Sequence, residues 1–251
     1  MKQAQAGEHE RAAANATLLA VMRRMASPLR HDLAGALLIP SLRLQMLRRQ
    51  LGAATLARER LQAMVDEVIA ALDAVRKTQV EVCGWLEQSD DTPVALDGAL
   101  AAVMATFNLF FSARGIGLEL RDSGAPQSLS YPAQALRLLL HAGFFLALDH
   151  APRASTLVVE CTANAGGARL SWHFEADKAA EGGPHADVPH ADIETARDRL
   201  TPSGVAALCR IFGARFESDS AHATALGTLA LPAALGIPAL SESSDAGLGA
   251  G

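Results

Sequence analysis

The sequence is poor in aromatic residues, in cysteine and in uninterrupted apolar runs. Its 251 residues include 1 Tyr, 2 Trp and 3 Cys, and aromatic residues make up only 4% of the chain. The three cysteines, Cys83, Cys161 and Cys209, are far apart and odd in number, so they fit neither a disulfide framework nor a zinc knuckle. We interpret them as buried thiols that act as small apolar residues.

The chain also lacks the features of a membrane or nucleic-acid-binding protein. No charge-free apolar run reaches the roughly 18 residues that a membrane-spanning helix needs. Glu8, Glu10 and Arg11 interrupt the N-terminal region, where a signal peptide would have its apolar core. The net charge of -5 argues against nucleic acid as a partner. We therefore predict a cytoplasmic protein that binds neither nucleic acid nor a membrane.

Hydrophobic residues make up 50% of the chain, and their spacing in the first half is helical. Apolar residues recur at steps of three and four over about residues 10–50, which predicts one long helix with kinks near Pro28 and Pro40. Gly52 marks a break, and a second helix is predicted over about 54–87. Its near-heptad apolar stripe consists of Leu61, Val65, Val68, Leu72, Val75, Val82 and Leu86.

Two long helices with a short connector form an antiparallel hairpin. One hairpin alone cannot bury such a stripe, whereas two hairpins packed as a four-helix bundle can. The sequence thus predicts a homodimer whose dimerisation hairpin covers residues 10–88. The polar residues 1–9 are predicted to fray.

The pattern becomes mixed after a predicted linker at residues 89–93. Helices are predicted over 96–113, 132–150 and 202–212, and strands over 115–121, 156–162, 168–175, 215–218 and 228–231. The residues between the second and third strands, 164–167, have the composition of a hairpin turn. The predicted fold class is α+β: a dimeric helical hairpin followed, over 94–233, by helices covering one face of a mostly antiparallel sheet. Residues 177–199 are expected to form a loop, and 234–251 a disordered tail.

One short motif lies on the first helix of this hairpin. The string from His31 to Leu37, HDLAGAL, resembles the phosphoacceptor box of histidine kinases, which reads histidine, acid, leucine, two variable positions, often proline, then leucine. Ala36 stands where that box usually has proline. The position of the box on a dimerising hairpin strengthens the resemblance.

The second half resembles the ATPase domain of the same kinases, but its nucleotide-binding boxes are degraded. Residues 136–152 resemble the helix whose asparagines hold magnesium and phosphates, and Ala142 and Leu146 occupy those positions here. Neither side chain offers the oxygen ligand that magnesium requires. The Asp-x-Gly-x-Gly box is missing after the strand that ends near Glu175, and the last glycine box is reduced to Pro202-Ser203-Gly204-Val205.

This combination resembles the kinase-like histidine phosphotransferases, which are dimers with an acceptor hairpin and a degenerate ATPase-like domain. The resemblance covers roughly residues 10–233. It implies that His31 takes a phosphoryl group from the aspartyl phosphate of a receiver domain, in a response regulator or a hybrid histidine kinase, and passes it to another receiver. It also implies no intrinsic cofactor, because the receiver would bring its own Mg²⁺, and no need for ATP.

The residues around His31 fit that role. Imidazole has an unperturbed pKa of about 6.5 and is a nucleophile near neutral pH. Ala34, Gly35 and Leu38 are helical neighbours of His31, and the two small ones allow a partner to approach closely. Gly35 costs up to about 1 kcal/mol relative to alanine in a helix, which indicates a local need. Arg30 is a candidate to steady the phosphoryl charge, and Asp32, the base of an active kinase, would orient the imidazole in a relay.

Three other functions compete with the relay. A divergent sensor kinase is disfavoured by the losses at Ala142 and Leu146. A non-catalytic adaptor or regulator of a two-component pathway would not need His31, and a purely structural coiled coil would leave the second half unexplained. His185 and His190 lie five residues apart in the polar loop without a further ligand, so no metal site is predicted.

Overall fold

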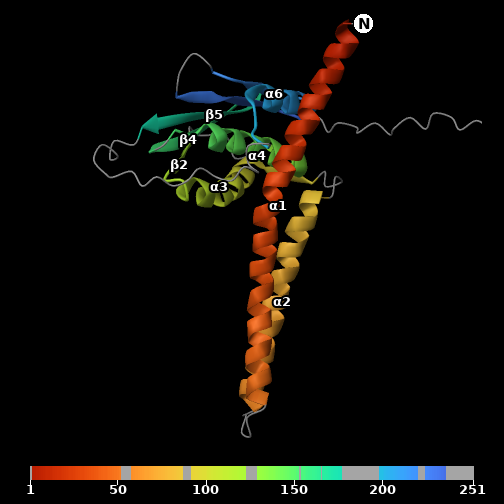
Figure 1. Cartoon of the computed structure of the whole chain (residues 1–251), viewed down its shortest axis with the longest axis vertical. Coiled ribbons are helices and arrows are strands. Elements are labelled where there is room, and N and C mark those ends of the chain that lie inside the picture. The colour runs from red at the N-terminus through yellow and green to blue at the C-terminus, as the bar shows by residue number, and fades with distance from the viewer. Residues whose placement is uncertain are drawn as a thin grey trace, which may run out of the picture. The chain divides into compact units, whose positions relative to one another are not determined.

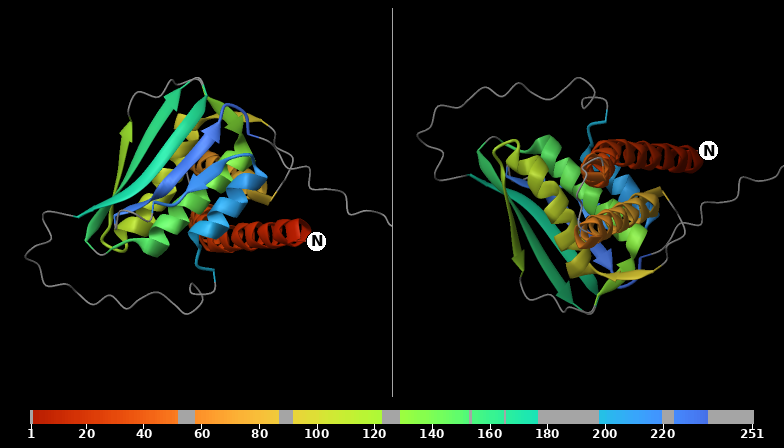
Figure 2. Two further views of the ribbon diagram at one scale, coloured as in Figure 1. Left: turned by 90° about the horizontal axis from the view of Figure 1, so that it is seen from above. Right: turned by 90° about the horizontal axis from the view of Figure 1, so that it is seen from below.

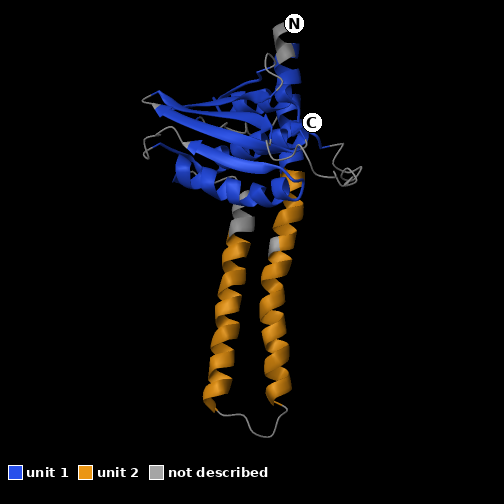
Figure 3. Cartoon of the chain, turned by 90° about the vertical axis from the view of Figure 1, so that its left-hand side faces the viewer, with its two compact units in different colours: residues 1–21, 91–251 blue, residues 22–90 orange. Residues whose placement is uncertain are grey.

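The protein divides into two compact units in the computed structural model (Figure 3). One unit contains residues 22–90, and the other contains residues 1–21 together with 91–251. The structure describes residues 2–51, 58–86, 92–122, 129–152, 154–164, 166–176, 198–219 and 224–235. The predicted polar loop with His185 and His190 falls almost entirely outside these residues, as do nearly all of the predicted tail and the side chains of Cys83 and Leu86.

Two long helices occupy the first part of the chain, α1 (Lys2–Leu51) and α2 (Arg58–Leu86). They agree with the periodicity, except that α1 starts at Lys2 and not near residue 10. Buried residues occur on α1 from Ala14 onward, and their surroundings are described below. α1 is helical on both sides of Pro28 and Pro40, and kinks at these prolines remain a prediction.

Only some residues of the apolar stripe on α2 are buried inside the hairpin unit. On α2, Val68 is buried and Leu61 and Val75 are half-buried, whereas Val65 and Leu72 are exposed. An ion pair ties the two helices together, with Arg43 Nη1 2.5 Å from Glu67 Oε2. The stripe predicted from the sequence therefore divides into a part that packs within the hairpin and a part that remains open in the single chain.

The other unit is built on a five-stranded sheet with the order β2-β4-β5-β7-β6. β2 pairs in parallel with β4, and the remaining neighbours are antiparallel. The strands are β2 (Gly117–Asp122), β4 (Ser155–Asn164), β5 (Gly167–Ala176), β6 (Arg215–Glu217) and β7 (Ala225–Pro232). Helices α3 (Leu96–Ser112), α4 (Ala133–His150) and α6 (Pro202–Ile211) lie on one face of this sheet (Figure 2). The predicted α+β layering of this unit is confirmed.

A second, two-stranded sheet joins β1 (Pro93–Ala95) to β3 (Ser130–Pro132). The sequence did not predict it, because three residues are too few for an alternating pattern to show. No helix in the described part of the chain is long and apolar enough to span a membrane.

Helix α4 is the centre of the sandwich. Every residue from Leu138 to Leu148 is buried, which is typical of a helix that is covered on all sides. Toward the sheet, a Cβ built on Gly143 would lie 2.8 Å from the Trp172 ring, so this glycine allows helix and strand to approach closely. Toward α3, the Phe107 ring stacks on Phe144 with centroids 5.1 Å apart.

The two cysteines whose side chains the structure describes behave as the sequence predicts. Cys161 and Cys209 are buried, and neither forms a disulfide. Burial raises the pKa of the Cys209 thiol to about 12, so it stays protonated and unreactive at neutral pH.

Candidate functional site

His31 lies in the hairpin part of α1 with its side chain exposed. The helix explains this exposure. Leu33 and Ala36 are half-buried and lie on the side of α1 that packs within the hairpin. At 100° per residue, His31 is turned by about 200° from Leu33 and so faces the opposite way. The imidazole is thus presented to solvent on a regular element, where another protein can reach it.

The predicted neighbours of His31 gather on the same stretch of helix. Ala34 and Gly35 are exposed, and Leu38 is 57% exposed. Arg30 Nε donates a hydrogen bond to the carbonyl oxygen of Ala26 at 3.3 Å, which anchors its guanidinium along the helix. The side chain of Asp32 lies outside the described residues, so its proposed orienting role stays a prediction.

The face that carries His31 continues as an apolar stripe that the sequence analysis found only in part. Gly35, Leu38 and Leu42 follow His31 by four, seven and eleven residues, a spacing that keeps them on one side of the helix. Leu42 is 48% exposed and was missed, although its spacing from His31 would have revealed it. We call His31, Gly35, Leu38 and Leu42 the acceptor face.

The glycine of the acceptor face has no role that the described chain explains. A Cβ built on Gly35 meets no atom within 4 Å. Glycine inside a helix costs up to about 1 kcal/mol relative to alanine, so a need from outside the chain would have to offset that cost. Close approach of a partner beside His31 is such a need.

A second exposed apolar stripe runs along another side of the hairpin. Leu37, Leu44 and Leu51 recur every seven residues and are 46%, 49% and 60% exposed. At 100° per residue, they lie roughly 150° around α1 from the acceptor face. Exposed apolar residues of α2 provide a similar stripe, consisting of Val65, Ile69, Leu72 and Val80. We call these two stripes the dimer face, because a heptad repeat is the pattern of helices that pack in bundles.

The positions predicted to have lost nucleotide ligands are core positions. Ala142 and Leu146 are both 0% exposed, in the middle of α4. Neighbouring His141 is buried as well, beside Phe107, with its Nδ1 2.7 Å from the carbonyl oxygen of Arg137. Desolvation lowers the pKa of His141 to about 4, so this histidine is neutral at physiological pH. Among the described residues, no group of three His, Cys, Asp or Glu side chains could hold a metal ion.

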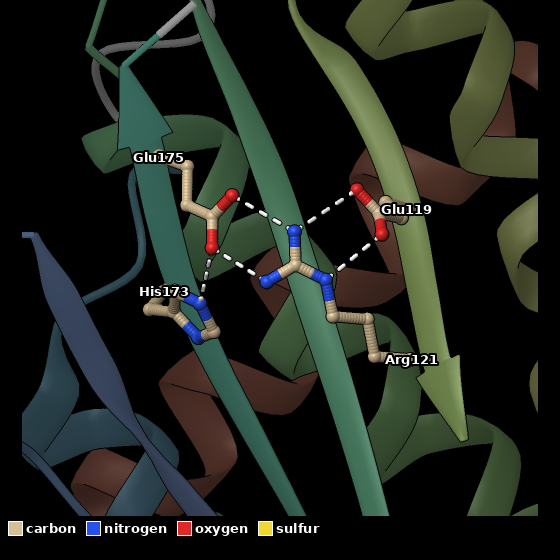
Figure 4. A network of polar contacts seen from close by, with 4 residues as sticks. All are labelled: Glu119, Arg121, His173 and Glu175. Atoms are coloured by element: carbon tan, nitrogen blue, oxygen red, sulfur yellow. Dashed lines mark hydrogen bonds and ion pairs between the residues drawn. The ribbon is translucent and has the colours of Figure 1, made fainter. Parts of the chain in front are cut away.

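A polar network lies on the sheet, where strands β2 and β5 flank β4 (Figure 4). Arg121 donates through Nε to Glu119 at 2.8 Å and through Nη1 to Glu175 at 2.5 Å, and His173 Nε2 lies 3.4 Å from Glu175 Oε1. Hydrogen bonding to Arg121 lowers the pKa of Glu175 to about 2 and also lowers that of Glu119. The Arg121 guanidinium is hydrogen-bonded to two carboxylates, so we interpret the network as a structural connection between strands β2 and β5 across β4.

Comparisons with known proteins give structural neighbours only. No protein-family model matches the chain, and no curated protein matches it either. Among solved structures, the chain is similar to a histidine kinase from Burkholderia phymatum STM815, with 19% identity, a TM-score of 0.43, and coverage of 81% of this chain and 95% of that one. The histidine kinase AdeS of Acinetobacter baumannii shows 14% identity and a TM-score of 0.41, over 80% of this chain and 97% of that one.

A third similar structure is the histidine kinase ThkA in complex with the response regulator TrrA. It shows 12% identity and a TM-score of 0.41, over 90% of this chain and 65% of that one. All three TM-scores are below 0.5, so the functional argument rests on the residues of this chain.

Proposed function

We propose that this protein is a histidine phosphotransferase of a bacterial two-component phosphorelay, and that His31 carries the phosphoryl group. The observation that carries the proposal is the exposed imidazole of His31 within an acceptor-box sequence on a two-helix hairpin. A small residue and two exposed leucines follow it on the same face, which is the surface that a docking receiver domain requires.

The reaction needs little from the protein beyond presenting the ring. The unprotonated nitrogen of His31 attacks the phosphorus of a receiver's aspartyl phosphate, a P–N bond forms, the P–O bond breaks, and the aspartate leaves as a carboxylate. The ring then releases its remaining N–H proton to water. The reverse sequence on a second receiver restores the imidazole. Phosphoryl transfer depends mainly on alignment and charge neutralisation, and Mg²⁺ bound by the receiver would supply the latter.

The second unit supports a relay over a kinase. Ala142 and Leu146 stand where the resemblance would place metal and phosphate ligands, and both are buried apolar groups. Magnesium takes oxygen ligands, which neither residue has. A kinase would therefore need to bind ATP through other groups, whereas a relay needs no nucleotide.

The dimer face supports assembly as a homodimer. Large apolar side chains rarely form a contiguous exposed surface on monomeric proteins, and such patches mark interaction sites. The dimer face repeats at heptad spacing on α1, so a second hairpin would bury it as a four-helix bundle. The acceptor face lies on another side of α1 and would stay accessible in that bundle.

Phosphoryl transfer from phosphorylated receiver domains tests the proposal. The purified protein is mixed with a panel of receivers carrying radiolabelled phosphate, and separately with radiolabelled ATP. We expect label to pass from a receiver to the protein and none to pass from ATP. His31→Ala should abolish the transfer. His9→Ala removes another exposed histidine of the same helix and should leave the transfer unchanged.

The outcomes separate the competing functions. Label taken directly from ATP and lost in His31→Ala would identify a kinase. Binding of a receiver without any labelling would identify an adaptor. Equal labelling of the two alanine variants would remove His31 from the mechanism.

A further inference from the structure

The remnant glycine box, Pro202-Ser203-Gly204-Val205, forms the first turn of α6. A helix start of this kind can bind a phosphate through its free backbone N–H groups. Here the chain itself satisfies one of them, because the Gly204 amide donates a hydrogen bond to the hydroxyl of Thr201 at 3.1 Å. The box nevertheless keeps its glycine, and this glycine is buried.

The surroundings of Gly204 show what requires a residue without a side chain. A Cβ built there would overlap the hydroxyl oxygen of Thr17, which comes from α1. It would also lie 3.1 Å from the Thr201 hydroxyl and 3.7 Å from the Cβ of Thr17. Thr17 is only 6% exposed, and its hydroxyl donates to the carbonyl oxygen of Ala13 at 2.9 Å. The α1 helix therefore packs closely against the glycine, as small residues at a helix contact permit.

Other buried residues of α1 lie on the same side of the helix as Thr17. Ala14 and Val21 are 0% exposed, at three and four residues from Thr17, so the three share one side of the helix. One turn before Ala14, Glu10 forms an ion pair with Arg210 near the end of α6. Figures 1 and 2 show α6 beside this first part of α1 in every view. These residues of α1 belong to the same compact unit as α6.

We propose that residues 10–21 of α1 are a strap that docks on α6 and has taken over the degenerate glycine box as its docking site. Gly204 is retained for helix packing, and the strap covers the turn at which a phosphate would otherwise approach. The strap and His31 belong to one helix, with Val21 ten residues before His31. This inference does not depend on the phosphotransfer proposal.

Hydrogen–deuterium exchange of the full chain tests the strap through a double-mutant cycle. Gly204→Ala places a methyl group against the Thr17 hydroxyl and should raise the exchange rates of amides in residues 12–21 about tenfold. Thr17→Ala removes the hydroxyl and should change these rates by less than about threefold. The double variant should return to within about threefold of the wild type, because the overlap with the Thr17 hydroxyl is gone and the distance to the Cβ at position 17 is an ordinary 3.7 Å.

Two controls distinguish a local effect on the strap from a general change in the stability of the protein. Gly98→Ala changes another helical glycine of the same unit, whose added Cβ meets no atom within 4 Å, and should leave strap exchange unchanged. Amides of residues 60–80 in α2 report on the hairpin and should not respond to any variant. Unchanged strap exchange in Gly204→Ala would overturn the proposal. So would failure of Thr17→Ala to rescue Gly204→Ala, since the glycine would then be needed for Thr201 alone.

Discussion

Gly35 is a helical glycine with open space around it. It sits in the interior of a helix, where glycine is unfavourable, and no atom of the described chain comes near the space that a side chain would fill. Gly204 is the opposite case, because Thr17 of the same chain occupies the corresponding space. The two glycines look alike in the sequence, and only the structure shows that one faces open space and the other faces packed side chains.

Gly35→Ala should stabilise the protein and impair its function. The helix gains up to about 1 kcal/mol in the free energy of unfolding, measured in urea. Transfer from a phosphorylated receiver should slow by about tenfold, because the added methyl group keeps the partner from its aligned position. Gly7→Ala is the matched control, since Gly7 also lies in α1 with open space around it. It should give a similar stabilisation with an unchanged transfer rate, and equal transfer in both variants would contradict the docking role of Gly35.

At the scale of elements, α3 and α4 pack through aromatic rings that enclose a histidine. The His141 ring contacts Phe107 edge-on with centroids 5.5 Å apart, and lies near Phe145. The His141 side chain is only 3% exposed within this packing. The burial of His141 makes the stability of the protein depend on pH. This burial comes from the packing of α3 against α4, which the sequence alone does not show.

Acid should weaken this packing in a defined window. Burial lowers the pKa of His141 from 6.5 to about 4, so between these values the unfolded chain binds a proton that the folded chain does not. The free energy of unfolding should therefore fall as pH falls through this window, by up to about 3 kcal/mol in total from this residue. His141→Phe removes the titration, and its unfolding free energy in urea should depend less on pH between 7 and about 4.5. Parallel curves for variant and wild type would place the acid sensitivity elsewhere.

At the scale of the whole molecule, the exposed large apolar side chains of the hairpin include two distinct stripes, the acceptor face and the dimer face. The acceptor face includes a histidine and a glycine, whereas the dimer face is a continuous heptad pattern of leucines on α1. If the proposed function is correct, the first would dock a receiver transiently and the second would hold the two copies of a dimer together. The two assignments can be tested independently.

Leu44→Glu should separate the dimer, because a carboxylate in an apolar bundle is strongly disfavoured. We expect the dissociation constant to rise by at least about 100-fold in sedimentation analysis. Leu38→Glu makes the same change at a leucine of similar exposure on the acceptor face. It should leave the dimer intact and slow the transfer. Loss of the dimer in Leu38→Glu, or its survival in Leu44→Glu, would show that the two faces are assigned wrongly.

Local chemistry by itself determined much of this protein. The spacing of apolar residues predicted the helices α1, α2, α3 and α6. Alternating apolar residues and a turn-like segment predicted the strands β4 and β5. The acceptor box lies within the first of the predicted helices, which placed His31 on a helix. These features depend on neighbours within a few residues. The side chains of Ala142 and Leu146 have no oxygen ligand for magnesium, and this too can be read from the sequence without the structure.

Only the tertiary structure decided which residues distant in sequence meet. It divided the apolar stripe of α2 into packed and exposed sides, and it brought Arg121 to Glu175 across β4. It also brought Thr17 to Gly204, and α1 is helical from Lys2 onward, where the polar sequence predicted fraying. Such contacts join residues that are far apart in the sequence, and no periodicity along the chain specifies which face of a helix will meet which distant element.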